Sequence, residues 1–282
     1  MKEKNVSYLK DQIKYTGFGE HLSDQLSQKI KQQLETFTLE YQTTYGQSSI
    51  EVELYFSKSL TRDMYFFNAY VVNLKGPAGR MTQTFYINKG NNFTLKEAYN
   101  LMSGRAVCKV FKNKEGKKYT CWVQLDPFTT TPNGNYKMAY YHENYGYNLE
   151  FTMSKYPILE MGLEEFKDSI ITSLEKGNMQ MVTFAIDGKE EIRFIEANPK
   201  FKSITIYNES MQKQFYPAES SKIKEVAEET TSQEEKTQTA DQTKKKGKVL
   251  TNLEKTVPET PPNLSENQHR KRKKRPRITR KM

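Results

Sequence analysis

The sequence predicts an α+β protein in which helices pack on antiparallel β-meanders. Apolar residues recur every third or fourth position over residues 5–36, as on one face of a helix. Over residues 37–42 and 50–56 they recur at every second position, as along half-buried strands, and residues 64–74 are apolar on both faces, as in a central strand. A third observation is that a pattern of helix, strand, turn and strand occurs twice between residues 94 and 208. These observations predict helices, meanders and an internal helix-hairpin-strand duplication.

Residues 1–88 are expected to form a helix pair followed by a four-stranded antiparallel meander. Leu22, Leu26 and Ile30 lie four residues apart and would share one helix face. The alternating runs that follow are separated by turn-like segments rich in Gly, Pro and Ser. The helices would cover one face of the sheet.

Residues 89–215 are expected to form a second domain made of two copies, about 94–142 and 163–208. GKKYTCWVQLDP at 116–127 and GKEEIRFIEANP at 188–199 match in kind with an offset of 72 residues. Thr94 followed by Glu97 is a capping box, which predicts a helix start, and Gly104 is placed to end that helix.

Residues 216–282 have the composition of a disordered linker that ends in a basic tail. They carry +7 of the chain's formal charge of +10, and residues 270–281 hold nine Lys and Arg and no acid. Such a segment neutralises phosphates and releases counterions, which predicts non-specific binding of nucleic acid, most simply DNA. A solubilising tail and a patch attracted to anionic lipid are the alternatives. The residues expected to contact nucleic acid are Lys244, Lys245, Lys246, Lys248, Arg270, Lys271, Arg272, Lys273, Lys274, Arg275, Arg277, Arg280 and Lys281.

The sequence assigns no catalytic residue, metal site or cofactor. It lacks the GxxxxGK[ST], HExxH and GxSxG signatures, which favours a protein that is not an enzyme. Cys108 and Cys121 have no C-x-x-C spacing for zinc. If their hairpin turns about Lys114 and Glu115, the two thiols would face each other across two strands.

Two other classes of function stay open. The first is a DNA-processing enzyme or topoisomerase accessory with a latent active site among Tyr140, Tyr141, His142 and Glu143. The tyrosines of residues 136–147 could also stack on bases, although aromatic residues are ordinary occupants of strands. The second is an inhibitor module that binds a protein by strand addition at an open sheet edge.

The expected location is the cytoplasm. No run approaches the roughly 18 apolar residues that cross a bilayer, and MKEKNVSYLKDQ at the start lacks the apolar segment of a secretory signal. We therefore expect no membrane span.

Two stretches carry a family resemblance: TFYINKGNNFTLKEAYNLMSGRAV at 84–107 and MVTFAIDGKEEIRFIEANPKFKSITIYN at 181–208. They resemble an uncharacterised domain family of unknown function that is encoded on conjugative transposons, near genes for DNA mobilisation and topoisomerase-like enzymes. The likeness covers roughly residues 5–215 and implies a DNA-mobilisation or topoisomerase-like partner, but no catalytic residues. Together these observations predict a non-enzymatic accessory or adaptor that tethers nucleic acid through its tail and contacts a protein through its folded part.

Overall fold

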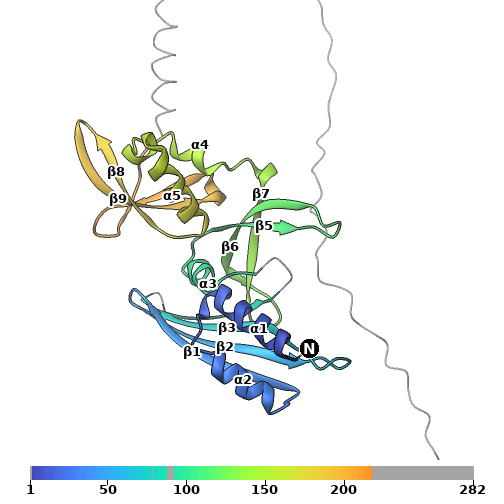
Figure 1. Cartoon of the computed structure of the whole chain (residues 1–282). Coiled ribbons are helices and arrows are strands. Elements are labelled where there is room, and N and C mark those ends of the chain that lie inside the picture. Colours follow the sequence, from blue (N-terminus) through green and yellow to red (C-terminus); the bar gives the residue numbers. More distant parts are fainter. Residues whose placement is uncertain (1, 78, 88–91, 218–282) are drawn as a thin grey trace, which may run out of the picture. The chain divides into compact units, whose positions relative to one another are not determined.

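The computed structural model describes residues 2–77, 79–87 and 92–217. Helices and antiparallel sheets account for most of these residues, which confirms the α+β class (Figure 1). All of these described residues belong to one unit of the chain, Met1–Gln233. The predicted basic tail, with all thirteen residues assigned to nucleic-acid binding from Lys244 to Lys281, lies outside the described residues.

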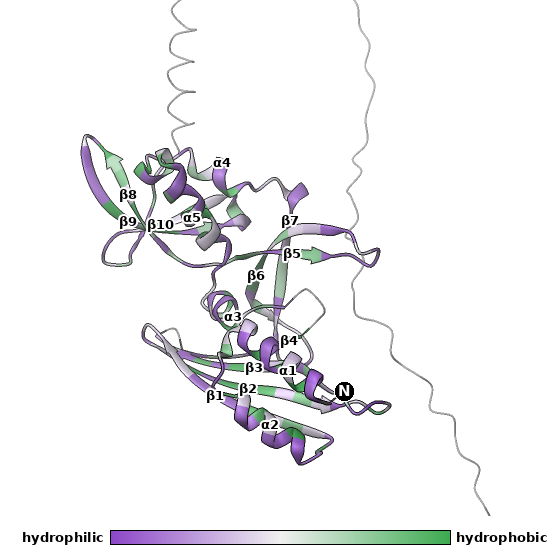
Figure 2. Ribbon diagram, in the orientation of Figure 1, coloured by the Kyte–Doolittle hydropathy of each residue, from purple (hydrophilic) through white to green (hydrophobic). Residues whose placement is uncertain are grey.

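The first sheet is a four-stranded antiparallel meander in the order β1-β2-β3-β4. Its strands are β1 (Thr36–Tyr45), β2 (Ser48–Lys58), β3 (Tyr65–Gly76) and β4 (Gly79–Tyr86). Burial alternates along β2 and β3, so one face of the sheet is apolar. Figure 2 shows hydrophobic residues along the strands of this sheet. Helices α1 (Lys2–Ile13) and α2 (Ser23–Lys31) bury Leu9, Leu26 and Ile30 in the same core.

The predicted break between the first two helices is a π-helical turn, η1 (Lys14–Phe18). Gly17 has a φ of 102° inside this turn, a conformation that residues with a Cβ atom rarely adopt. The turn places Phe18 in the core, where its ring meets the rings of Tyr41 and Tyr70 edge-on at 5.4 Å each. The irregular segment therefore contributes one of the central buried side chains.

The remaining elements form two series, each with a helix followed by three strands, and the second series ends in an additional two-residue strand. The first series is α3 (Leu95–Met102), β5 (Val107–Lys112), β6 (Lys118–Thr130) and β7 (Tyr136–His142), which form a sheet in the order β5-β6-β7. The short elements η2 (Glu143–Tyr145), α4 (Leu149–Met153) and η3 (Leu159–Gly162) connect it to the second series. That series is α5 (Glu164–Glu175), β8 (Gln180–Ile186), β9 (Lys189–Asn198), η4 (Pro199–Phe201), β10 (Ser203–Tyr207) and β11 (Lys213–Gln214), with sheet order β11-β10-β9-β8.

Helices α3 and α5 end in the same hydrogen-bond pattern. The N–H of Arg105 donates to the carbonyl of Asn100 at 3.0 Å, and that of Asn178 donates to the carbonyl of Ser173 at 3.1 Å. Gly104 and Gly177 precede these donors with φ of 82° and 78°. In both helices this is a Schellman ending, in which a left-handed residue lets the chain satisfy the last carbonyls. The predicted capping box at the start of α3 is also present.

The buried side chains form two clusters. The first joins the inner face of the β1–β4 sheet to Phe93, Leu101 and Val123, and so continues beyond the boundary expected near residue 88. The second contains Trp122, Leu174 and the inner residues of β8, β9 and β10. The domain limits 1–88, 89–215 and 216–282 stay predictions.

Two local features differ from what the sequence predicts. Leu163 and Phe166 continue the three- and four-residue spacing of Ile170 and Leu174, which predicts one apolar helix face, but they are 54% and 55% exposed, and the buried part of α5 begins only at Ile170. Tyr216, expected to belong to the linker, packs against the second cluster with its ring 5.5 Å from that of Phe184. The compact part of the chain thus includes this residue.

Gly177 and Gly104 allow a matched test of the helix ends. Gly177→Ala would place a Cβ 2.9 Å from both the carbonyl oxygen of Ala106 and Cγ2 of Val107, whereas a Cβ at Gly104 meets nothing within 4 Å. Both substitutions force alanine into a left-handed conformation that costs about 1 kcal/mol. We expect Gly177→Ala to lower the free energy of unfolding by about 3 kcal/mol, because overlap in a packed site adds to that cost, and Gly104→Ala by about 1 kcal/mol. Equal losses in denaturant unfolding would show that the close approach at Gly177 is not present.

Candidate functional site

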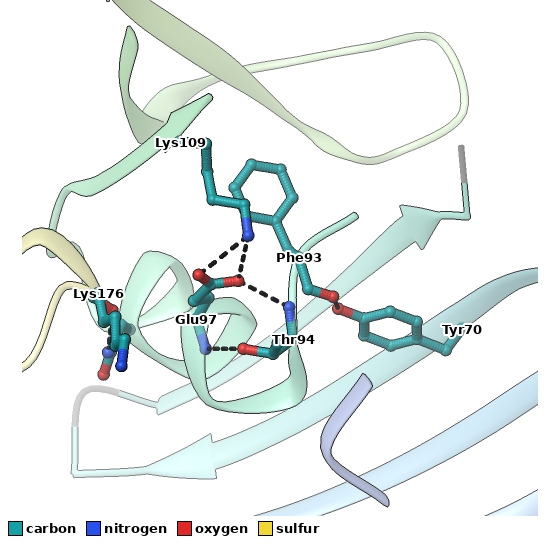
Figure 3. Close-up of polar contacts among 7 residues, drawn as sticks. Tyr70, Phe93, Thr94, Glu97, Lys109 and Lys176 are labelled. Carbon is teal, nitrogen blue, oxygen red and sulfur yellow. Dashed lines mark hydrogen bonds and ion pairs between the residues drawn. The ribbon is translucent and has the colours of Figure 1, made fainter. Parts of the chain in front are cut away.

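A buried carboxylate fixes the start of α3 and the first strand of the β5–β7 sheet. Glu97 accepts from the backbone N–H of Thr94 at 2.8 Å, while its own N–H donates to the Thr94 hydroxyl at 3.3 Å. Both carboxylate oxygens also accept from Nζ of Lys109, at 3.0 and 2.9 Å. The side chains of Glu97 and Lys109 are only 10% and 20% exposed. Figure 3 shows the lysine between this carboxylate and the ring of Phe93, whose centroid is 5.7 Å from Nζ.

Further polar contacts hold both ends of α3. Before its first turn, the hydroxyl of Tyr70 donates to the carbonyl of Phe93 at 2.7 Å (Figure 3), and burial raises the pKa of this phenol. At its last turn, the fully buried Asn100 donates to the carbonyl of Lys176 at 2.7 Å. Nε of Arg105 donates to the carbonyl of Gly177 at 2.9 Å. Helix α3 is therefore anchored to β3 at one end and to the end of α5 at the other.

Four rings gather on one face of the β5–β7 sheet. Phe111 and Tyr119 are directly opposite each other on β5 and β6, with ring centroids 5.8 Å apart and planes 26° from parallel. Tyr119 also stacks on His142 of β7 at 5.3 Å and 30°. Tyr140 meets Phe111 edge-on at 6.1 Å. Phe111 is buried, Tyr119 is half-buried, and Tyr140 and His142 are exposed, so the outer rings rest on a buried one.

Four exposed lysines surround the turn next to these rings. The hairpin between β5 and β6 reads KNKEGKK at 112–118 and has a net charge of +3. Lys112 and Lys118 are paired across its strands, although like charges placed opposite each other are unfavourable. The hairpin between β8 and β9, DGKEE at 187–191, has a net charge of −2. The shared strand arrangement therefore does not require a basic turn.

The four residues considered for a latent active site are divided: Tyr140 and His142 share one face of β7, Tyr141 lies on the other face, and Glu143 begins η2. Tyr140 of β7 lies on the same face of the sheet as Phe111 of β5. Its hydroxyl is 3.6 Å from the sulfur of Met138, two residues away on that face. Tyr141 lies on the opposite face, because successive strand residues alternate, and its ring is 5.1 Å from that of Tyr145. The tyrosines of residues 136–147 are thus divided between two faces.

The predicted pairing of Cys108 with Cys121 is wrong, because the register of β5 on β6 differs from the expected one by one residue. Cys108 is opposite Trp122, and Cys121 is opposite Lys109. The loop from Asn113 to Lys117 is longer than a two-residue turn, and a shift of one residue in register sends a side chain to the other face. The thiols therefore lie on opposite faces of the sheet. Burial raises their pKa values, to about 12 for Cys108 and about 11 for Cys121.

The sequence signals left two features of this region unrecognised. The grouping of Phe111, Tyr119 and His142 depends on strand register, which residue patterns alone did not supply. The ion pair between Glu97 and Lys109 has no local sequence signal, because the spacing of Thr94 and Glu97 indicates only a helix cap.

Neither a metal-binding cluster nor a membrane-crossing helix is found in the described part of the chain. Its His, Cys, Asp and Glu side chains form no group of three or more suited to a metal ion. The helices that the structure describes are all too short or too polar to cross a bilayer.

Comparison of the chain with models of known protein families, with curated proteins and with solved structures found no match. The resemblance to a domain family encoded on conjugative transposons therefore stays a prediction.

The buried ion pair can be tested against an exposed one. Glu97→Ala leaves the largely buried Lys109 ammonium without its partner and removes a helix cap, so we expect a loss of about 3 kcal/mol in the free energy of unfolding. Glu164→Gln removes one partner of Lys167 at the surface, where the glutamate is 83% exposed, and should cost less than about 0.5 kcal/mol. Denaturant unfolding of both variants provides the measurement. If Lys109→Met fails to recover part of the Glu97→Ala loss in the double variant, the two side chains are not coupled.

Thiol alkylation checks the corrected register. In the native protein at pH 8 we expect iodoacetamide to modify both cysteines at least about a hundredfold more slowly than in the denatured chain, because the raised pKa values leave little thiolate. An oxidant should give no intramolecular disulfide, since the Cβ vectors point apart. A disulfide between Cys108 and Cys121 formed without unfolding would disprove the assigned register.

Proposed function

We propose that this protein is a non-enzymatic accessory or adaptor of a conjugative mobile element. It tethers nucleic acid through the basic segment near its C-terminus and contacts a protein of the DNA-processing machinery through its folded part. The observation that carries this proposal is the charge distribution. Residues 270–281 alone have a net charge of +9, whereas residues 1–215 have a net charge of +3. A dense cationic segment binds phosphates irrespective of base sequence.

Exposed apolar side chains support the proposed contact with a protein. Phe151 of α4 is 62% exposed, and Leu163 and Phe166 near the start of α5 are also exposed. Lys167 of α5 joins the two helices through an ion pair with Glu150 of α4 at 3.1 Å. It also pairs with Glu164 within α5. Large apolar side chains that gather at a surface are typical of protein interfaces. The open edges of the sheets offer strand addition as a second mode of contact.

The two helix-and-three-strand series are, in this proposal, copies of one module. Their Schellman endings and their shared order of elements support this view. The turns before β6 and β9 also each contain a left-handed glycine, Gly116 at φ 82° and Gly188 at φ 74°. Duplication would supply two similar scaffolds whose surfaces diverged in charge.

Salt-dependent DNA binding tests the tethering role. Replacing the nine Lys and Arg of residues 270–281 by Gln in the full chain should weaken binding to duplex DNA at least about tenfold at 0.1 M salt. The slope of log affinity against log salt should also become clearly shallower, by about 0.9 for each phosphate that is no longer neutralised. Fluorescence anisotropy over a salt series measures both quantities.

A scrambled order of residues 270–281 provides the control, because it keeps every charge and should bind as the natural chain does. Deleting residues 244–282 should weaken binding at least as much as the Gln replacement. Equal affinity and slope for the natural and neutralised chains would exclude tethering by the tail.

A further inference from the structure

We propose that the ring-bearing face of the β5–β7 sheet is a second nucleic-acid site, one that binds unpaired bases of single-stranded DNA or RNA. Its rings are Phe111, Tyr119, Tyr140 and His142, and its cationic border is the lysine hairpin 112–118. This site adds to the tethering role proposed above: the tail attracts any phosphate chain, whereas this face requires bases that are free to stack.

The exposed rings of this face rest on rings that are buried or half-buried. A base stacks on the face of an exposed aromatic ring, and neighbouring side chains can hold that ring in place. Buried Phe111 supports Tyr140 edge-on, and Tyr119 supports exposed His142 by stacking. Tyr140 is 52% exposed, and partial burial of its hydroxyl raises its pKa, so it is a neutral phenol at pH 7 and does not repel phosphate.

Charge complementarity selects the occupant. The turn places Lys114 and Lys117 in solvent beside the rings, whereas Lys112 and Lys118, next to Phe111 and Tyr119 along their strands, lie on the opposite face. Glu115 is the single acid among residues 112–118. In the described residues Lys109, on the same face, is already paired with Glu97, which leaves the hairpin lysines as the cations for phosphates. Rings bordered by exposed lysines match alternating bases and phosphates of a single strand better than an apolar protein surface.

The second series supplies an internal comparison. The residue 72 positions after Tyr119 is Glu191, and the turn there is acidic. Phe184 of β8, which packs inside the second cluster, is itself fully buried beneath Tyr156 and Tyr216. A similar strand pair is thus present with Glu191 in place of Tyr119 and with an acidic turn in place of the basic one. The features of the first sheet are therefore not consequences of the strand arrangement alone.

Ring substitutions in the full chain test the inference. The double variant Tyr140→Thr with His142→Thr keeps strand-forming residues and should lower affinity for a single-stranded oligothymidine about tenfold or more. Affinity for a duplex of equal length should change less than about twofold, because the tail supplies that binding. Tyr86→Thr is the control: Tyr86 is 57% exposed on β4 and lies outside the ring group. It should leave the ratio of single-strand to duplex affinity unchanged.

Lysine substitutions give a readout that does not depend on ring packing. Lys114→Gln with Lys117→Gln should reduce the salt slope for the single strand by about 0.7 for each phosphate that these lysines no longer neutralise. Lys189→Gln, in the corresponding turn of the second series, should leave the slope unchanged. The ring variant should instead weaken the affinity for the single strand and leave the salt slope unchanged, because stacking releases no counterions.

The outcomes separate this site from the tail. If the ring and lysine variants unfold as the natural chain does and keep its single-strand preference and salt slope, the second site is overturned while tethering by the tail can still hold. If they lose that preference whereas the neutralised tail binds normally, the tail proposal fails and this site stands. Capture of a protein on this face without preference for single strands would also overturn the inference.

Discussion

The Glu97 carboxylate is the constraint on which the middle of the molecule depends. It caps α3 and at the same time neutralises Lys109 on β5. An ammonium and a carboxylate shielded from water are tolerated only when each satisfies the other. Moving β5 relative to α3 would separate these charges, so the pair fixes where β5 begins. Phe111 is two residues after Lys109 on β5, so its side chain points to the same face of the sheet, and the ion pair fixes that direction as well.

The C-terminal end of α3 is fixed by amides rather than charges. Asn100 is fully buried, and its side-chain N–H groups donate to Lys176 and Asn178, while its oxygen accepts from Arg105. A buried amide costs free energy unless it is hydrogen-bonded, which makes this contact specific in geometry. The close approach of Gly177 to the same segment permits it. The charged pair orients one end of the helix, and the amide network orients the other.

Local sequence signals predicted the elements well because they have local causes. The capping box at Thr94 and the alternation along β2 are determined by residues three or two positions apart. The register of β5 on β6 is not local, since one more loop residue moves Cys121 to the other face. The ring face could not be predicted for the same reason: Phe111, Tyr119 and His142 become neighbours only when two registers are known. Exposure of Phe166 likewise depends on what α5 packs against, which its own periodicity does not specify.

The two proposed sites differ in how their affinity responds to salt, and this difference makes them complementary. Counterion release by a basic segment weakens steeply as salt rises, whereas stacking of a base on a ring changes little. A chain with the tail alone would bind duplex and single strand with little preference, and it would dissociate from both as salt rises. A chain with the ring face alone would have few cations to attract a strand before stacking could begin. Joined in one polypeptide, the tail raises the local concentration of nucleic acid around the folded part. The rings near Phe111 then retain those segments whose bases are unpaired, which is the state that DNA passes through whenever its strands are separated.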